Sequence, residues 1–343
     1  IVAGHTNYVF SVAFSPDGHT LATASADHTA RLWDLHDPHH PTTLSTLTGH
    51  TNYVYSVAFS PDGHTLATAS ADHTARLWDL HDPHHPTTLS TLTGHNDTIR
   101  SVAFSPNGRT LATASTDHTT RLWDLSDPHH PTTLSTLTGH TNAVYSVTFN
   151  PDGHILGTAS TDNTIRLWDL HDPHHPTTLS TLTGHADTVR SVAFSPDGYT
   201  LATAGTDNTA RLWGLHDPHH PTTLSTLLGH TSAVSSVAFS PDGHTLATAS
   251  ADHTTRLWDL STPHHPTPLG TLTGHTDYVH SVAFSADGHT LATASADHTA
   301  RLWETNVDRV AARICSINPA ITKSEWDQYL PDLPYQPPCQ RAT

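Results

Sequence analysis

Histidine, serine and aspartate recur together in this chain at fixed spacing, and the second copy of the set comprises His50, Ser70, Asp72 and Trp78. An imidazole held between a hydroxyl and a carboxylate can activate a nucleophile, as it does in hydrolases. The set occurs in six of the seven units and lacks only the serine in the fifth, whereas an active site is normally one constellation that breaks symmetry. No nucleophile elbow, phosphate-binding glycine loop or HExxH motif accompanies it. We therefore predict a structural role for the set and no catalytic residues.

Pairs of adjacent histidines, such as His84-His85, occur in six segments bounded by prolines. Imidazoles bind zinc, copper or nickel, but a dedicated site needs three or four ligands in a fixed geometry and a pair supplies two. The two cysteines, Cys315 and Cys339, lie near the C-terminus, which excludes a cysteine-based zinc site. A disulfide between them and two reduced thiols both stay open. We predict adventitious metal binding at the histidine pairs, no dedicated metal site and no cofactor.

These residues lie in a repeat of 45 residues, which runs from Gly4-His5 in the first unit to Trp303 in the last without insertion or deletion. In the second unit, β-branched and aromatic residues predict a strand over 53–59 that is buried on both faces. Turn residues and prolines separate three further strands, predicted over 66–70, 74–78 and 87–92. Four strands in each of seven units predict a ring of four-stranded blades. The paired histidines then lie on the face opposite the Gly-His dipeptides.

The order Gly-His, Ser-Pro-Asp-Gly, Ser-x-Asp and Arg-Leu-Trp-Asp resembles the WD-repeat β-propellers over residues 1–304, with departures in some units such as Gly214, Ala286 and Glu304. The resemblance implies an all-β, seven-bladed propeller of four-stranded antiparallel blades. It also implies one hydrogen-bonded chain per blade, formed in blade two by His50, Ser70, Asp72 and Trp78. Blade five carries Gly205 in place of the serine, so we expect it to be the least cross-braced blade.

Charge and hydropathy exclude several classes of function. The chain carries 31 acidic and 14 basic residues, a formal net charge of −17 at pH 7, and no cluster of Lys or Arg. Such a chain repels phosphate backbones and anionic lipids, so we predict no nucleic-acid partner and no membrane association. No apolar run reaches the length of a membrane span and no signal peptide is visible, so we expect a cytoplasmic protein. Because methionine is absent, we expect a fragment or a processed product.

Comparing the units with one another locates the expected binding site. Residues 4–47 and 49–92 differ only at Phe10 and Tyr55, and across all units the differences concentrate just after Gly-His. In WD-repeat propellers these positions surround the mouth of the central channel, where such proteins commonly bind peptides or proteins. Aromatic residues and arginines are typical interface anchors. The expected partner-binding residues are Tyr8, Phe10, Tyr53, Tyr55, Thr98, Arg100, Tyr145, Thr188, Arg190, Ser235, Tyr278 and His280.

The favoured function is thus a non-enzymatic scaffold or sensor module that binds a protein or peptide. A glycan-binding propeller is one alternative, although Arg100, Arg190 and Ser235 break the equivalence of the sugar-stacking positions that it requires. A propeller enzyme is another, with Arg100, Arg190 and His280 as the candidates for an asymmetric polar cluster in the channel. Neutral drift at positions free of packing constraints is the alternative to any binding role.

The two chain ends carry further predictions. Residues 305–343 are predicted to form two short helices, the first opened by a capping box at Thr305-x-x-Asp308, and an extended proline-rich end. Repeats with such a tail resemble the C-terminal regions of bacterial STAND-type signalling ATPases, which implies a part of a larger signalling protein. The last unit lacks a fourth strand, and Ile1-Val2-Ala3 are predicted to supply a stub of it. Either upstream sequence completes that strand, or blade seven stays three-stranded with the tail helices beside it. We expect a monomer, with a strand-swapped dimer through blade seven as the alternative.

Overall fold

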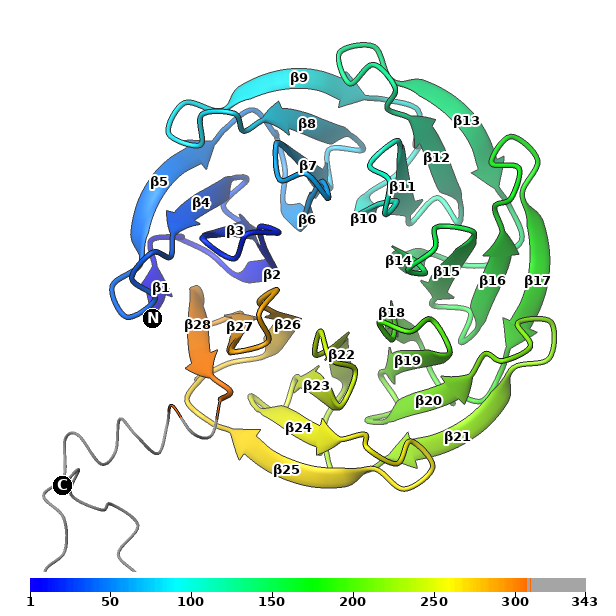
Figure 1. The fold of residues 1–343 in the computed structure, drawn as a ribbon. Helices are drawn as coiled ribbons and strands as arrows, with labels where there is room; N and C mark the ends of the chain where they lie inside the picture. The colour runs from blue at the N-terminus through cyan, green and yellow to red at the C-terminus, as the bar shows by residue number, and fades with distance from the viewer. Residues whose placement is uncertain (307–308, 310–343) are drawn as a thin grey trace, which may run out of the picture.

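Seven four-stranded antiparallel sheets form a ring around a central channel, and each sheet is one blade of a propeller (Figure 1). The computed structural model describes residues 1–306 and 309. The predicted all-β architecture of seven four-stranded blades is confirmed in that part of the chain. Each blade begins with an inner strand beside the channel and ends with an outer strand on the circumference (Figure 1).

The first two strands of each blade form its inner half. The inner strands are β2 (Val9–Phe14), β6 (Val54–Phe59), β10 (Ile99–Phe104), β14 (Val144–Phe149), β18 (Val189–Phe194), β22 (Val234–Phe239) and β26 (Val279–Phe284). The second strands are β3 (Thr20–Ser25), β7 (Thr65–Ser70), β11 (Thr110–Ser115), β15 (Ile155–Ser160), β19 (Thr200–Gly205), β23 (Thr245–Ser250) and β27 (Thr290–Ser295).

The other two strands form the outer half. The third strands, which carry the tryptophans, are β4 (Ala30–Asp34), β8 (Ala75–Asp79), β12 (Thr120–Asp124), β16 (Ile165–Asp169), β20 (Ala210–Gly214), β24 (Thr255–Asp259) and β28 (Thr299–Glu304). The outer strands are β5 (Thr42–Leu47), β9 (Thr87–Leu92), β13 (Thr132–Leu137), β17 (Thr177–Leu182), β21 (Thr222–Leu227), β25 (Thr267–Leu272) and, for blade seven, β1 (Val2–Ala3).

The two faces of the disc differ in their loops. On the first, which we call the Gly-His face, each Gly-His loop bonds to the turn between the second and third strands, as in the bond from the N–H of Ala26 to the carbonyl of Tyr8. On the opposite face, the loop with the paired histidines bonds to the Ser-Pro-Asp-Gly turn, as in the bond from the N–H of Leu35 to the carbonyl of His19. The predicted separation of the two kinds of loop is thus confirmed.

Every inner strand contains a β-bulge near its start. In β6, Val54 lies opposite Ser70 and Ser56 opposite Ala69, so Tyr55 has no partner in β7. The extra residue interrupts the alternation of side chains, so Tyr55 and Ser56 both face the channel while Val54 and Val57 are buried. The expectation that the strand over 53–59 is buried on both faces is therefore wrong, because one side of it lines the channel.

The hydrophobic core lies between neighbouring blades rather than within one of them. Ala22 and Leu32 of blade one, for example, pack against Val54, Leu66 and Trp78 of blade two. Equivalent clusters occur at the other blade interfaces of the described residues. Each blade buries its apolar faces only when both neighbours are present, which is why the repeat is stable as a closed ring.

Blade seven is closed by the N-terminus of the chain. Val2 pairs with Ala300 and Ala3 with Thr299, which confirms the predicted stub of a fourth strand (Figure 1). The stub has two residues, whereas the outer strand of blade one has six. Leu302 is therefore half-buried, although the equivalent Leu32 of blade one is 0 % exposed.

Of the predictions for the C-terminal tail, only the start falls within the described residues. The hydroxyl of Thr305 donates to the carbonyl of Gly288 at 2.7 Å. The side-chain oxygen of Asn306 accepts the backbone N–H of Arg309 at 3.0 Å. The two predicted helices, the proline-rich end and both cysteines lie outside the described residues. No helix within the described part is long and apolar enough to cross a membrane.

Candidate functional site

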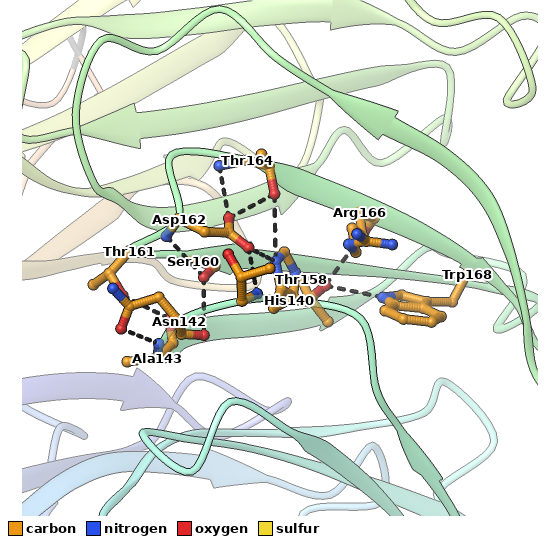
Figure 2. A network of polar contacts seen from close by, with 11 residues as sticks. His140, Asn142, Ala143, Thr158, Ser160, Thr161, Asp162, Thr164, Arg166 and Trp168 are labelled. Carbon is orange, nitrogen blue, oxygen red and sulfur yellow. Dashed lines mark hydrogen bonds and ion pairs between the residues drawn. The ribbon is translucent and has the colours of Figure 1, made fainter.

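A buried chain of side-chain hydrogen bonds connects the strands of every blade. In blade four, the indole N–H of Trp168 donates to Oγ1 of Thr158 at 2.9 Å, and that oxygen lies 2.8 Å from Nε2 of His140 (Figure 2). Nδ1 of His140 lies 2.9 Å from a carboxylate oxygen of Asp162. The same three contacts recur in the other six blades.

One arrangement of protons satisfies all the groups in this chain. Since the threonine oxygen accepts from the tryptophan, its own proton goes to Nε2, and the Nδ1–H goes to the carboxylate. Burial alone would raise the pKa of Asp162, but hydrogen bonds from Thr164, the N–H of Thr141 and His140 lower it to about 2. Burial lowers the pKa of His140 against the opposing effect of Asp162. At neutral pH, an ionised aspartate therefore accepts a hydrogen bond from a neutral histidine.

The hydroxyl in this chain belongs to a threonine and not to the predicted serine. In blade two, Thr68 lies 2.8 Å from His50 and accepts from Trp78 at 3.0 Å. Ser70 lies beside the chain, and its Oγ accepts the backbone N–H of Asp72 at 3.0 Å. Thr68 and Ser70 are two residues apart on one strand, so both point to the same side of the sheet and spacing alone could not choose between them. The presence of threonine in all seven units was the available signal.

Blade five keeps the complete chain. His185 lies 2.9 Å from Asp207 and 2.8 Å from Thr203, which accepts from Trp213 at 3.0 Å. The prediction that this blade is the least cross-braced is therefore wrong as far as the hydrogen-bonded chain of side chains is concerned. Gly205 replaces a serine that is not a member of that hydrogen-bonded chain. The threonine of every chain is 0 % exposed, so no substrate reaches its hydroxyl and the chain is structural.

The side chains at the bulge positions surround the mouth of the channel on the Gly-His face. Together with the serine that follows each of them, they line a cavity of about 200 Å³. We call these seven residues the mouth ring. In blade order they are Phe10, Tyr55, Arg100, Tyr145, Arg190, Ser235 and His280. All seven belong to the predicted partner-binding set, so the structure brings this part of the set together.

One half of the mouth ring is aromatic. The ring centroid of Phe10 lies 4.8 Å from that of Tyr55 and 5.1 Å from that of His280. Tyr8 and Tyr53 contact Phe10 from outside, with centroids 6.3 and 6.2 Å away. These two tyrosines are 44 % and 40 % exposed. The aromatic half therefore continues from the channel onto the surface of the Gly-His face.

The other half carries two arginines on either side of a tyrosine. The guanidinium of Arg100 lies 4.1 Å from the ring centroid of Tyr55 and 4.9 Å from that of Tyr145. The guanidinium of Arg190 lies 5.4 Å from the ring centroid of Tyr145. Neither arginine forms an ion pair with a carboxylate of the described residues. Two uncompensated positive charges thus stand at the channel mouth of a strongly acidic chain.

The neighbours of His280 keep it neutral. Burial and the positive charge of Arg190 lower the pKa of His280 to about 4, against the opposing effect of Asp277. At neutral pH its imidazole therefore offers one N–H donor and one nitrogen acceptor.

Histidines of the preceding blade support the outer tyrosines, and sequence reasoning missed them. His298 lies 5.7 Å from Tyr8, and His28 lies 5.7 Å from Tyr53. Tyr278 contacts the equivalent histidine of blade six. Each histidine occupies a left-handed turn position, with φ of 68° at His298 and 71° at His28. The Asp-His-Thr tripeptide indicated a turn, but only the blade order shows that the ring lies under a tyrosine of the next unit.

Three predicted residues contribute little side-chain surface to the site. Thr98 and Thr188 are half-buried, and their carbonyls accept the backbone N–H of the turn between the second and third strands. The hydroxyl of Ser235 donates to the carbonyl of Val279 at 2.8 Å. The exposed side chains of the predicted set are therefore three tyrosines and one arginine, namely Tyr8, Tyr53, Tyr278 and Arg190.

A family model described as "WD domain, G-beta repeat" matches the chain in seven segments, each of which spans the outer strand of one blade and the first three strands of the next. These are residues 1–34, 41–79, 86–124, 131–169, 176–214, 221–259 and 266–304. The chain belongs to the WD40-repeat family. A curated relative, the Notchless protein homolog of Arabidopsis thaliana, is 57 % identical over 35 residues. The matched region covers 10 % of this chain and 7 % of that protein, which is less than one WD40 repeat.

The opposite face of this WD40 propeller carries stacked imidazoles. The ring of His19 in a Ser-Pro-Asp-Gly turn lies 4.6 Å from that of His36, and the ring of His64 lies 4.5 Å from that of His81. In residues 1–306 and 309, no group of three or more His, Cys, Asp or Glu could hold a metal ion. On this side, phenylalanines and prolines of blades three to seven line a second cavity of about 410 Å³.

Proposed function

We propose that this WD40 propeller is a non-enzymatic module that binds a protein or peptide on its Gly-His face, around the mouth ring. One observation carries the proposal: seven otherwise similar units differ at the residues that converge on one ring. Packing constrains the residues between the blades, such as the buried Val54 and Val57. The mouth-ring side chains point into the channel instead, so they are free to serve recognition.

The composition of this face suits protein recognition. Tyr8, Tyr53 and Tyr278 are 44, 40 and 51 % exposed. Tyrosine offers a large contact area at a small cost in conformational entropy, and arginine adds directional hydrogen bonds. Neutral drift would give no bias toward aromatic residues at these positions.

The alternatives fit this geometry less well. A glycan-binding propeller needs one aromatic platform per blade, but the contacting rings form one arc from Tyr55 through Phe10 to His280. A propeller enzyme needs an acid, base or nucleophile at a reacting centre. The residues that line the mouth cavity include no carboxylate and no thiol, and His280 is the one imidazole among them.

The wider role is part of the same proposal. We place the propeller in a larger cytoplasmic signalling protein of the bacterial STAND type, as its sensor or scaffold part, because the repeats and the tail together resemble such proteins. We also propose that it is monomeric, since β1 closes blade seven within one chain.

The test is a comparison of two arginine variants. Arg100→Ala combined with Arg190→Ala removes both charges of the mouth ring, whereas Arg109→Ala removes an exposed arginine of the opposite face. Binding partners are captured from the source cytosol, identified, and titrated against each purified variant. Loss of two charge-assisted hydrogen bonds, about 1.5–3 kcal/mol each, weakens binding at least tenfold. Equal affinity for wild type and the double variant, or a loss only with Arg109→Ala, would contradict the assigned face.

A further inference from the structure

The mouth ring is interrupted at one place. From His280 onward, each residue contacts the next through a ring or a guanidinium, in the order Phe10, Tyr55, Arg100, Tyr145 and Arg190. Ser235 then separates Arg190 from His280, and its hydroxyl is occupied by the carbonyl of Val279. Blades two and four carry a tyrosine at this position, so the serine leaves room for one large side chain.

The two sides of this gap have complementary chemistry. Arg190 is exposed and contacts the ring of Tyr145, whereas Arg100 lies between two rings and its Nε is buried. Arg190 is therefore the more accessible of the two guanidinium groups. On the other side of the gap stands His280, neutral at pH 7, with one N–H to donate.

The carboxylates in the loops that precede Arg190 and His280 accept hydrogen bonds from those loops. Asp187 accepts the backbone N–H of Thr188 at 2.6 Å, and Asp277 accepts that of Tyr278 at 2.7 Å. Neither forms an ion pair with Arg190. The guanidinium thus lacks a counter-ion within the described part of the chain.

We propose that the gap at Ser235 binds the carboxylate side chain of an aspartate or glutamate of a partner, with Arg190 as its counter-ion and His280 as a hydrogen-bond donor. The inference rests on the proposed function and names the chemistry of the partner. One accessible guanidinium balances one negative charge, which fits a carboxylate better than a doubly charged phosphoryl group. Phe10 and Tyr8 lie next to His280, at 5.1 and 6.4 Å between centroids, and offer contact area to the residue beside the acidic one.

The internal repeats supply variants that suit the fold. Ser235→Tyr fills the gap with the residue of blades two and four, and Arg190→Ser introduces the residue of blade six at the equivalent position of blade five. Arg109→Ala is the charge-matched control on the opposite face. His280→Phe, which introduces the residue of blade one, assigns the NMR signal of the imidazole. Each variant is first checked for an unchanged melting temperature.

The experiment follows the Cε1 proton of His280 by NMR at pH 7, while sodium acetate replaces sodium chloride at constant ionic strength. We expect a saturable shift in the wild type and in Arg109→Ala, and at least tenfold weaker binding of acetate to Arg190→Ser and Ser235→Tyr. A parallel titration with inorganic phosphate separates the two kinds of oxyanion. A response to phosphate without one to acetate would overturn the carboxylate assignment, and a response to neither would overturn the anion site.

The outcome is separable from that of the proposed function. If acetate has no effect while the partner depends on the mouth ring, the inference fails and the proposed function stands. If acetate binds as expected while no partner depends on that face, the proposed function fails instead.

Discussion

Replacing Thr68 by valine should destabilise the protein much more than replacing Ser70 by alanine. Thr68 is 0 % exposed, and its Oγ1 both accepts from Trp78 and donates to His50. Valine has the same shape, so Thr68→Val leaves an indole N–H and an imidazole nitrogen buried without partners. Each unpaired buried group costs about 1–3 kcal/mol, so we expect a loss of about 2–6 kcal/mol in the free energy of unfolding.

Ser70→Ala removes weaker contacts. Its Oγ accepts from the N–H of Asp72 at 3.0 Å and donates to the carbonyl of Asn52 at 3.3 Å, and blade five carries a glycine at the equivalent position. We expect a cost of about 1 kcal/mol. Thr68→Ser keeps the hydroxyl and should lose only about 1 kcal/mol for the missing methyl group.

The assay is equilibrium unfolding in urea, followed by tryptophan fluorescence and repeated by circular dichroism to test for intermediates. The urea concentrations at the midpoints of unfolding are compared for the three variants, provided that the free energy of unfolding depends on urea concentration with the same slope in each. The reasoning is refuted if Ser70→Ala lowers the midpoint as much as Thr68→Val does, or if Thr68→Ser fails to restore most of the loss.

Three further predictions concern the seam, the glycines and pH. Adding Thr-Thr-Leu-Ser before Ile1 extends β1 along β28 in the register of blade one. The added strand covers the half-buried Leu302, so we expect a gain of about 1–3 kcal/mol in the free energy of unfolding and a higher melting temperature. The control extension Gly-Ser-Gly-Ser should not raise the melting temperature. Gly49→Ala should destabilise by about 1–3 kcal/mol in urea unfolding, because φ is 139° and a Cβ would lie 2.9 Å from an arginine nitrogen, while Gly270→Ser meets nothing within 4 Å and should be neutral. Acidification from pH 7 to pH 5 should lower the urea concentration at the midpoint of unfolding. Burial lowers the pKa of His280, and of the histidines in the hydrogen-bonded chains of blades four to seven, below the value of 6.5 in the unfolded protein. As the pH falls, the unfolded state therefore binds more protons than the folded state and gains stability relative to it. His280→Phe should reduce the change of the urea midpoint with pH. If the midpoint of the wild type were the same at pH 5 as at pH 7, the lowered pKa values of these histidines would be contradicted.

The strands could be predicted because each depends on local pattern. β-branched and aromatic runs between Gly, Pro and Asp turns determine four strands, and an exact period repeats them seven times. The strand over 87–92 is observed with those bounds. The strand stub at Ile1-Val2-Ala3 could also be predicted, and Val2 does pair with Ala300, but the sequence left open how blade seven is completed.

The errors all concern which side chains meet. Thr68 and Ser70 point to the same side of one strand, and only the position of His50 on a neighbouring loop selects the threonine. Tyr55 was assigned to a strand buried on both faces, although a bulge turns it into the channel. The repeat period and the strand propensities of the residues do not determine which hydroxyl joins the hydrogen-bonded chain or which side of the strand lines the channel. Both outcomes depend on contacts between segments that are far apart in the sequence.

The seven-bladed scaffold and the positions at which its units differ follow from residue types and spacing along the chain. What those positions do together depends on the folded ring. The β-bulges turn one side chain of each blade toward the mouth of the channel, where aromatic rings contact two arginines that have no ion-pair partner in the described residues. The small side chain of Ser235 leaves a gap between Arg190 and His280. Residues 45 positions apart become neighbours only when the ring closes, which is the physical reason why the repeat could be recognised before its binding surface could.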